Sequence, residues 1–172
     1  MQSLEGIQTK NHANAMVRIG NFLWDDGKAK DSELLLRQAM QITTQILGHD
    51  HLNTLTSMNN LAETYRDQGS ITEAAALQEE VLQKSRRILG DDHPDTLTSM
   101  NNLAGTYWAQ GRTMEVAALH EEVLQNFRQI LGDDHPSTLS SINSLAETYR
   151  AEGRTAEGAV LHEEVLQKHH YP

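Results

Sequence analysis

The feature that most constrains this chain is a motif that returns every 42 residues. Three histidines keep that interval: His51, His93 and His135. Four glycines keep it as well: Gly27, Gly69, Gly111 and Gly153. A fixed period of this length is typical of repeat proteins, in which each copy is a small unit that stacks on its neighbours. The sequence therefore predicts four copies, at residues 9–50, 51–92, 93–134 and 135–172, after an N-terminal extension at 1–8, all within one domain over 1–172.

Each copy is predicted to form two helices. In the third copy the apolar residues lie three and four positions apart, as on one stripe of an α-helix; they are Leu97, Met100, Leu103, Ala104 and Tyr107. Pro94 suits the first helical position, because the N–H that it lacks would be unpaired there anyway. Gly111 favours a left-handed cap that ends the helix. A second helix is expected from Thr113, a candidate N-cap, to Gly132.

The two outer copies differ from the inner ones. The first is the most diverged, with helices expected near residues 11–26 and 29–47 and with Ile19, Leu23 and Leu36 on the buried side. The fourth departs from the pattern after Gln167, so its second helix should be short and leave an apolar flank uncovered. The predicted fold class is all-α, a right-handed α-solenoid of four helix-turn-helix repeats.

The residues of the second copy resemble the tetratricopeptide repeat (TPR). The pattern is a Leu-Ala-x-x-Tyr run, a glycine four residues after the tyrosine, and a small residue early in the second helix: Leu61, Ala62, Tyr65, Gly69 and Ala74. The usual repeat has 34 residues, whereas the longer run HPDTLTSMNNLAxTYxxQGR, EEVLQ and ILGDD resembles kinesin light chain and the arrays of fungal and bacterial nucleotide-binding signalling ATPases. Polar residues replace the aromatic residue usual in the middle of the second helix: Gln78, His120 and His162.

Composition excludes several function classes. A formal net charge of −10 argues against nucleic acid or an anionic membrane as a partner, because binding phosphates needs clustered Lys and Arg. The chain has no cysteine, which excludes disulfides and Cys-based zinc sites and fits a cytoplasmic protein. No apolar run approaches the length of a membrane span, and no signal peptide is recognisable.

No catalytic or metal-binding constellation is predicted. Equivalent histidines of stacked repeats lie about 10 Å apart, too far to share one ion, and fit turn and cap positions better. His120 and His162 precede two glutamates, but Leu124 and Leu166 stand where a metalloprotease helix needs its second histidine. The glutamate pairs 79–80, 121–122 and 163–164 are better explained as a solvated outer face than as catalytic carboxylates. We therefore expect no enzymatic activity, no cofactor and no metal.

What remains is a surface along the first helices. In stacked hairpins these helices line the concave side, so polar residues beside their apolar stripes should face a groove. The predicted peptide-binding residues are Trp24, Asn59, Asn60, Glu63, Arg66, Asn101, Asn102, Trp108, Asn143, Glu147 and Arg150. Asparagine offers a donor and an acceptor, so the row of Asn59, Asn101 and Asn143 could hold the backbone of an extended peptide, the role that the resemblance to kinesin light chain implies. The alternative is that these asparagines bond to neighbouring helices or water.

One position of the first helix alternates between tryptophan and arginine: Trp24, Arg66, Trp108 and Arg150. These two residue types are the most frequent binding hot spots. Because arginine occupies the equivalent positions, Trp108 is not expected to be fully buried. Acidic Glu63, Asp67 and Glu147 stand nearby, so the groove is mixed in sign and no preference for acidic peptides is implied.

The predicted function is protein–protein interaction through a peptide or protein segment bound in the concave groove of a monomer. The alternative is a structural module that associates with copies of itself through its ends or outer face, since the short last helix exposes an apolar flank.

Overall fold

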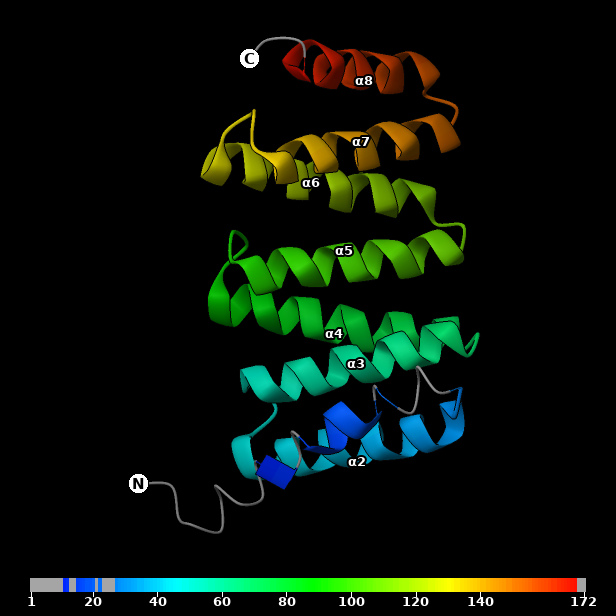
Figure 1. Ribbon diagram of the computed structural model, residues 1–172, viewed down its shortest axis with the longest axis vertical. Coiled ribbons are helices and arrows are strands. Elements are labelled where there is room, and N and C mark those ends of the chain that lie inside the picture. The colour runs from blue at the N-terminus through cyan, green and yellow to red at the C-terminus, as the bar shows by residue number, and fades with distance from the viewer. Residues whose placement is uncertain (1–10, 13–14, 21, 23–26, 170–172) are drawn as a thin grey trace. The chain divides into compact units, whose positions relative to one another are not determined.

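The computed structural model describes residues 11–12, 15–20, 22 and 27–169, and their regular structure is helical, without strands (Figure 1). The helices are α2 (Ala29–Leu47), α3 (Leu52–Asp67), α4 (Ile71–Leu89), α5 (Pro94–Ala109), α6 (Thr113–Leu131), α7 (Pro136–Ala151) and α8 (Thr155–His169). The second to fourth copies are thus the hairpins α3–α4, α5–α6 and α7–α8. The predicted all-α fold of helix-turn-helix repeats is confirmed.

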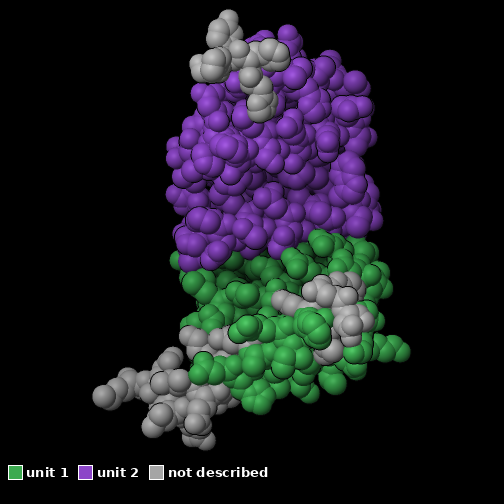
Figure 2. All heavy atoms as spheres, viewed as in Figure 1, with its two compact units in different colours: residues 1–88 green, residues 89–172 purple. Residues whose placement is uncertain are grey.

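The chain divides into two compact units, residues 1–88 (unit 1) and 89–172 (unit 2), which Figure 2 distinguishes by colour. Unit 1 has a core of Leu55, Met58 and Val81 from α3 and α4, against which Met40 and Leu77 pack. In unit 2, α6 packs on α5, α7 on α6, and α8 on α7. A cluster of buried residues joins α6, α7 and α8 through Leu124, Ile142, Leu145 and Val165. The single domain over 1–172 stays a prediction.

A histidine begins the first helix of each of the last three copies. The Nδ1 atoms of His51, His93 and His135 each accept a hydrogen bond, at 3.1 Å, from the backbone N–H two residues later. This bond satisfies one of the backbone donors that a helix N-terminus leaves unpaired. Pro94 and Pro136 occupy the first helical position, as predicted for Pro94. The interpretation of these histidines as cap residues is confirmed.

Glycine ends the same helices in a Schellman motif. In the third copy Gly111 N–H donates to the carbonyl of Trp108 (2.9 Å), and Arg112 N–H donates to that of Tyr107 (2.9 Å). Gly111 has a φ of +72°, a conformation that side chains with a Cβ seldom adopt. The same pair of bonds follows Tyr65 and Tyr149 in the neighbouring copies. The turn fixes how each second helix starts relative to its first.

The predicted apolar stripe of α5 is buried, with relative exposures from 0% at Met100 to 8% at Tyr107. In the fourth copy α8 lies close to α7 at Gly158. A Cβ added to Gly158 would lie 2.7 Å from the carbonyl oxygen of Ala146, closer than side-chain atoms pack. The glycine therefore sets the spacing of this hairpin.

Three predicted details differ from the structure or lie outside it. Thr113 is the first residue of α6, and the N-cap is Arg112, whose side chain makes no cap bond. Ile19 is 51% exposed, so its predicted burial is wrong, whereas Leu36 is buried as expected. Leu23 lies outside the described residues.

Candidate functional site

The candidate site is a hollow of about 720 Å³ in unit 2, bordered by α5, α6 and α7. Its volume falls in the range of ordinary ligand pockets. The helix α5 contributes Asn101, Ala104, Gly105 and Trp108; α6 contributes Val116, His120, Val123 and Phe127; α7 contributes Pro136, Ser137, Ser140, Ser141, Ser144, Glu147 and Thr148. Two first helices thus form the walls, and the second helix between them in sequence contributes mostly apolar residues and one histidine.

Three of the predicted peptide-binding residues line this hollow: Asn101, Trp108 and Glu147. Trp108 is 48% exposed, which agrees with the expectation that it would not be fully buried. Asn102 and Asn143 are half-buried and Arg150 is exposed, and none of the three belongs to the lining. The structure therefore gathers only part of the predicted set in unit 2.

The predicted residues of unit 1 lie on α3. Asn59, Asn60 and Glu63 are half-buried, and the Oδ1 atom of Asn59 is buried without a hydrogen-bond partner among the described residues. Arg66 lies 3.5 Å from the carboxylate of its neighbour Asp67. Trp24 is outside the described residues. The binding role of these unit 1 positions stays a prediction.

Hydroxyl groups of α7 line the hollow in a regular row. Ser141, Ser144 and Thr148 each donate their hydroxyl hydrogen to the backbone carbonyl four residues earlier, over 3.0, 3.2 and 2.8 Å. Because each hydroxyl has one hydrogen and two lone pairs, a hydroxyl committed in this way can only accept from a ligand. Three of the five hydroxyls that α7 contributes to the lining can therefore only accept.

His120 is the polar side chain that α6 adds to the lining. Its Nδ1 lies 2.9 Å from the hydroxyl oxygen of Thr148, whose hydrogen already goes to the carbonyl of Ser144. With the Thr148 hydrogen on that carbonyl, Nδ1 is the donor, and in this tautomer Nε2 is an acceptor in the neutral ring. Burial lowers the pKa of His120 below its ordinary value and outweighs a backbone hydrogen bond at Ser144 that acts in the opposite direction.

His120 and the α7 hydroxyls were not among the predicted site residues. A signal existed in the sequence, because Gln78, His120 and His162 replace an aromatic residue that is usual at that position. A polar group there needs a partner when it is buried. Which partner it finds depends on the neighbouring repeat and cannot be read from spacing within one copy.

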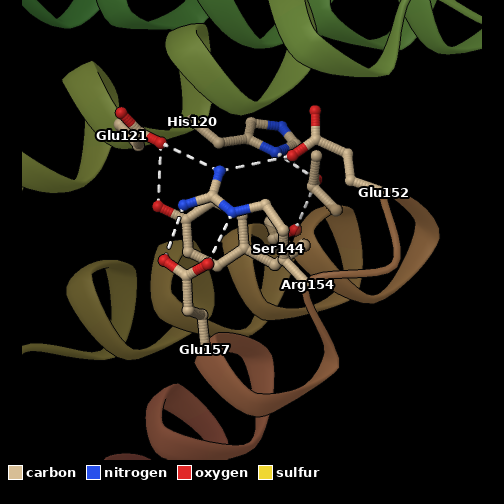
Figure 3. A network of polar contacts seen from close by, with 8 residues as sticks. His120, Glu121, Ser144, Glu152, Arg154 and Glu157 are labelled. Atoms are coloured by element: carbon tan, nitrogen blue, oxygen red, sulfur yellow. Dashed lines mark hydrogen bonds and ion pairs between the residues drawn. The ribbon is translucent and has the colours of Figure 1, made fainter.

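Figure 3 shows Arg154 in a polar network that joins α6, α7 and α8, in a view that also contains His120 and Ser144. Its guanidinium donates two hydrogen bonds to Glu157, over 2.8 and 2.7 Å, and one to Glu152 over 3.3 Å. It also stacks on the ring of Tyr149, 3.6 Å from the centroid. The hydroxyl of Tyr149 donates to Glu121 over 2.8 Å.

This network and the pair of Arg128 and Glu164 show that glutamates of α6 and α8 bond to neighbouring repeats. Glu121 is exposed, as expected for a solvated outer face, and Glu164 is half-buried, and each also contacts a neighbouring repeat. Glu164 receives two hydrogen bonds from Arg128, over 2.7 and 2.8 Å. The described residues contain no group of three or more His, Cys, Asp or Glu that could hold a metal ion. These carboxylates therefore act in contacts between repeats.

Models of the tetratricopeptide repeat match residues 11–84, 58–129 and 138–170. The chain belongs to the tetratricopeptide repeat family. TPRs generally mediate protein–protein interactions, and proteins built from kinesin-light-chain-like repeats are typically non-catalytic. No curated protein matches the chain. Among the helices of the described residues, none combines the length and the apolar character needed to cross a membrane.

Solved structures agree with this assignment. Two crystal structures of nearly identical TPR-like repeats, from a Podosopora anserina protein described as a kinesin light chain, are 30% identical to the chain. They match with TM-scores of 0.81 and 0.82 over 91% of this chain and 74% of theirs. BtubC (BKLC) from P. vanneervenii has the same fold at 16% identity, with a TM-score of 0.81 over 91% of this chain and 63% of that one. The resemblance to kinesin-light-chain-like repeats is confirmed.

Proposed function

We propose that this TPR protein binds an extended segment of another protein along the first helices of unit 2, α5 and α7, and that the hollow of this unit receives one of the segment's side chains. The observation that carries the proposal is the 48% exposure of Trp108 at the rim of a hollow of about 720 Å³. A tryptophan left half exposed beside a recess is costly to hydrate, and it is the residue type most often found as a hot spot.

Asn101 supports the same proposal from the opposite end of the wall. It is exposed, lines the hollow and makes no hydrogen bond with another described side chain. An amide of this kind can pair with the N–H and C=O of a peptide backbone. The segment would then be held by its backbone at Asn101 and by an inserted side chain beside Trp108.

The test uses a phage-displayed library of random 12-residue peptides and the complete chain. Enriched peptides are synthesised with a fluorescent label, and their dissociation constants are measured by anisotropy. Trp108→Ala should weaken binding by about fivefold or more, which corresponds to about 1 kcal/mol. Met114→Ala is the matched control, because Met114 is 78% exposed but lies outside this hollow. Equal weakening by both substitutions, or no enriched peptide, would refute the proposal.

A second candidate function is self-association through α8. Val160 and Leu166 on this helix are 65% and 59% exposed, and exposed apolar residues on one helix favour association. Light scattering over a range of concentrations separates the two functions. A mass that rises with concentration and falls back in a Val160→Glu, Leu166→Glu variant would favour self-association.

A further inference from the structure

The polar lining of the hollow is unbalanced in charge. Among the described residues that line it, Glu147 is the carboxylate, and no lysine or arginine accompanies it. Glu147 is exposed and makes no hydrogen bond or ion pair with any described residue. Arg150, one turn further along α7, is exposed and lies outside the lining. A negative charge therefore faces the hollow without a partner.

The neutral polar groups of the lining point to the same kind of ligand. The hydroxyl of Ser144, which is half-buried, has given its hydrogen to a backbone carbonyl, so it presents lone pairs. Ser141 and Thr148 have done the same but are buried, and Thr148 also contacts His120. In the tautomer in which Nδ1 donates to Thr148, Nε2 of His120 is also an acceptor. These acceptors suit a ligand that brings several donors. The lining also has donors, in the amide of Asn101 and the hydroxyls of Ser137 and Ser140, so the preference for a cation comes from the charge of Glu147.

The opposite wall offers an aromatic face and space. Trp108 is half exposed, and tryptophan is the side chain that attracts cations best through its ring. Next to it stands Gly105, at a position where the second and fourth copies have Glu63 and Glu147. Because glycine has no side chain, no acidic group projects from this position of α5.

We propose that the hollow of unit 2 selects a basic side chain, arginine before lysine, in the segment that the array binds. The guanidinium has five N–H donors in a plane, so it can stack on Trp108 while donating to Glu147 and to the acceptors of α7. Lysine carries the same charge but lacks the planar fork. The inference rests on the proposed function and adds the chemical class of the segment.

The test begins with the composition of the peptides enriched from the 12-residue library. Arginine should dominate one position, and replacing it with citrulline, which has the same shape without the charge, should weaken binding about fivefold. Glu147→Gln should weaken the arginine peptide by a similar factor and leave the citrulline peptide unchanged. Trp108→Ala should weaken both.

The chain has a net charge of −10, so any basic peptide is attracted to it weakly. Glu163→Gln controls for this attraction, because Glu163 is exposed on α8, has no partner among the described residues and carries the same charge. It should change binding by less than about 1.5-fold.

The outcomes separate the two proposals. Enriched peptides without a basic residue, or equal losses of affinity in Glu147→Gln and Glu163→Gln, would overturn the inference. The hollow would still be a peptide site if Trp108→Ala weakened binding. If no peptide is enriched, the proposed function fails and the inference fails with it. Preference for the arginine peptide, lost only in Glu147→Gln, would establish both.

Discussion

The two units use the same tyrosine of the repeat in opposite ways. In unit 1 the hydroxyl of Tyr65 accepts a hydrogen bond of 2.5 Å from Arg37 on α2. In unit 2 the hydroxyl of the equivalent Tyr149 donates a bond of 2.8 Å to Glu121 on α6. Arg37 and Glu121 occupy the same position of the second helix, two periods apart. A tyrosine hydroxyl can donate or accept, so one geometry tolerates either charge.

The turn residue changes together with the helix residue. In unit 2 the turn carries Arg154, which stacks on Tyr149 and lies 3.8 Å from Glu121. In unit 1 the same turn position is Ser70, and the arginine comes from α2 instead. Each tyrosine thus has one arginine beside it. Helix α2 supplies this arginine in unit 1, and the turn after α7 supplies it in unit 2. Copies with nearly the same backbone are in this way made non-equivalent, which disfavours pairing between the wrong repeats.

The close approach within a hairpin is the second contrast. In unit 1 the glycine is Gly20, where a Cβ would lie 2.9 Å from the side chain of Leu36. In unit 2 it is Gly158, where a Cβ would lie 2.7 Å from the backbone oxygen of Ala146. A side chain can rotate away from an added methyl group, whereas a backbone carbonyl moves only with its helix.

Alanine at these glycines should therefore give the largest difference between the units. We expect Gly158→Ala to lower the free energy of unfolding by about 1 to 3 kcal/mol, the cost typical of overpacking. Gly20→Ala should cost less, because Leu36 can rearrange and alanine favours helix. Urea denaturation measures both, and Ala159→Gly on the exposed side of α8 controls for helix propensity. A larger loss for Gly20→Ala would contradict the comparison.

Reversing the charge at the tyrosine should have the next largest effect. Glu121→Arg removes the acceptor of Tyr149 and places a second arginine beside Arg154. Loss of the tyrosine hydrogen bond alone should cost about 1 kcal/mol. Glu163→Arg is the matched control, since it stands at the same position of the next copy without a described partner. Equal denaturation midpoints for the two variants would show that the network does not stabilise unit 2.

These contrasts show where prediction from sequence stops. The interval of 42 residues predicted the hairpins, and glycine with histidine predicted the helix ends, because those signals act within one copy. Arginine at the equivalent positions of two other copies predicted that Trp108 would not be fully buried, and Trp108 is 48% exposed. The partners of Tyr65 and Tyr149 lie 28 residues away, in a preceding copy, and differ in charge. Such contacts depend on how the copies pack against each other. The exposure of Ile19, which was predicted to be buried, depends on the same packing.

The third contrast depends on pH. At the position of Gln78 in unit 1, unit 2 has His120, whose pKa is lowered from its ordinary value of 6.5 by burial. As pH falls through 6.5 the unfolded chain binds a proton at this residue before the folded chain does. Its contribution to stability is therefore present above pH 6.5 and is lost as the pH falls toward the lowered pKa of the folded protein.

His120→Gln converts the unit 2 site to the residue of unit 1 and should remove this part of the pH dependence. The measurement compares urea denaturation at pH 7.5 and pH 5.8 for the original chain and for the variant, because the other histidines are common to both. If the variant loses as much stability as the original chain on acidification, His120 does not titrate differently on folding.

The smallest expected effect comes from exchanging the charge pattern of unit 1 for that of unit 2. Arg37→Glu gives Tyr65 the acceptor that Tyr149 has, and Ser70→Arg supplies the turn arginine, with Glu73 three residues on as Glu157 is for Arg154. Each substitution alone should destabilise, Arg37→Glu by about 0.5 kcal/mol, because it loses an exposed ion pair of 2.8 Å with Glu33.

Together the two substitutions should restore most of that loss, so a double-mutant cycle should give a favourable coupling of about 0.5 to 1 kcal/mol. The cycle tests the idea that the tyrosine requires one arginine and is indifferent to which element supplies it. Additive losses would show instead that position 37 on α2 requires arginine whatever residue stands at position 70 in the turn after α3. The tyrosine contacts of the two units would then not be interchangeable.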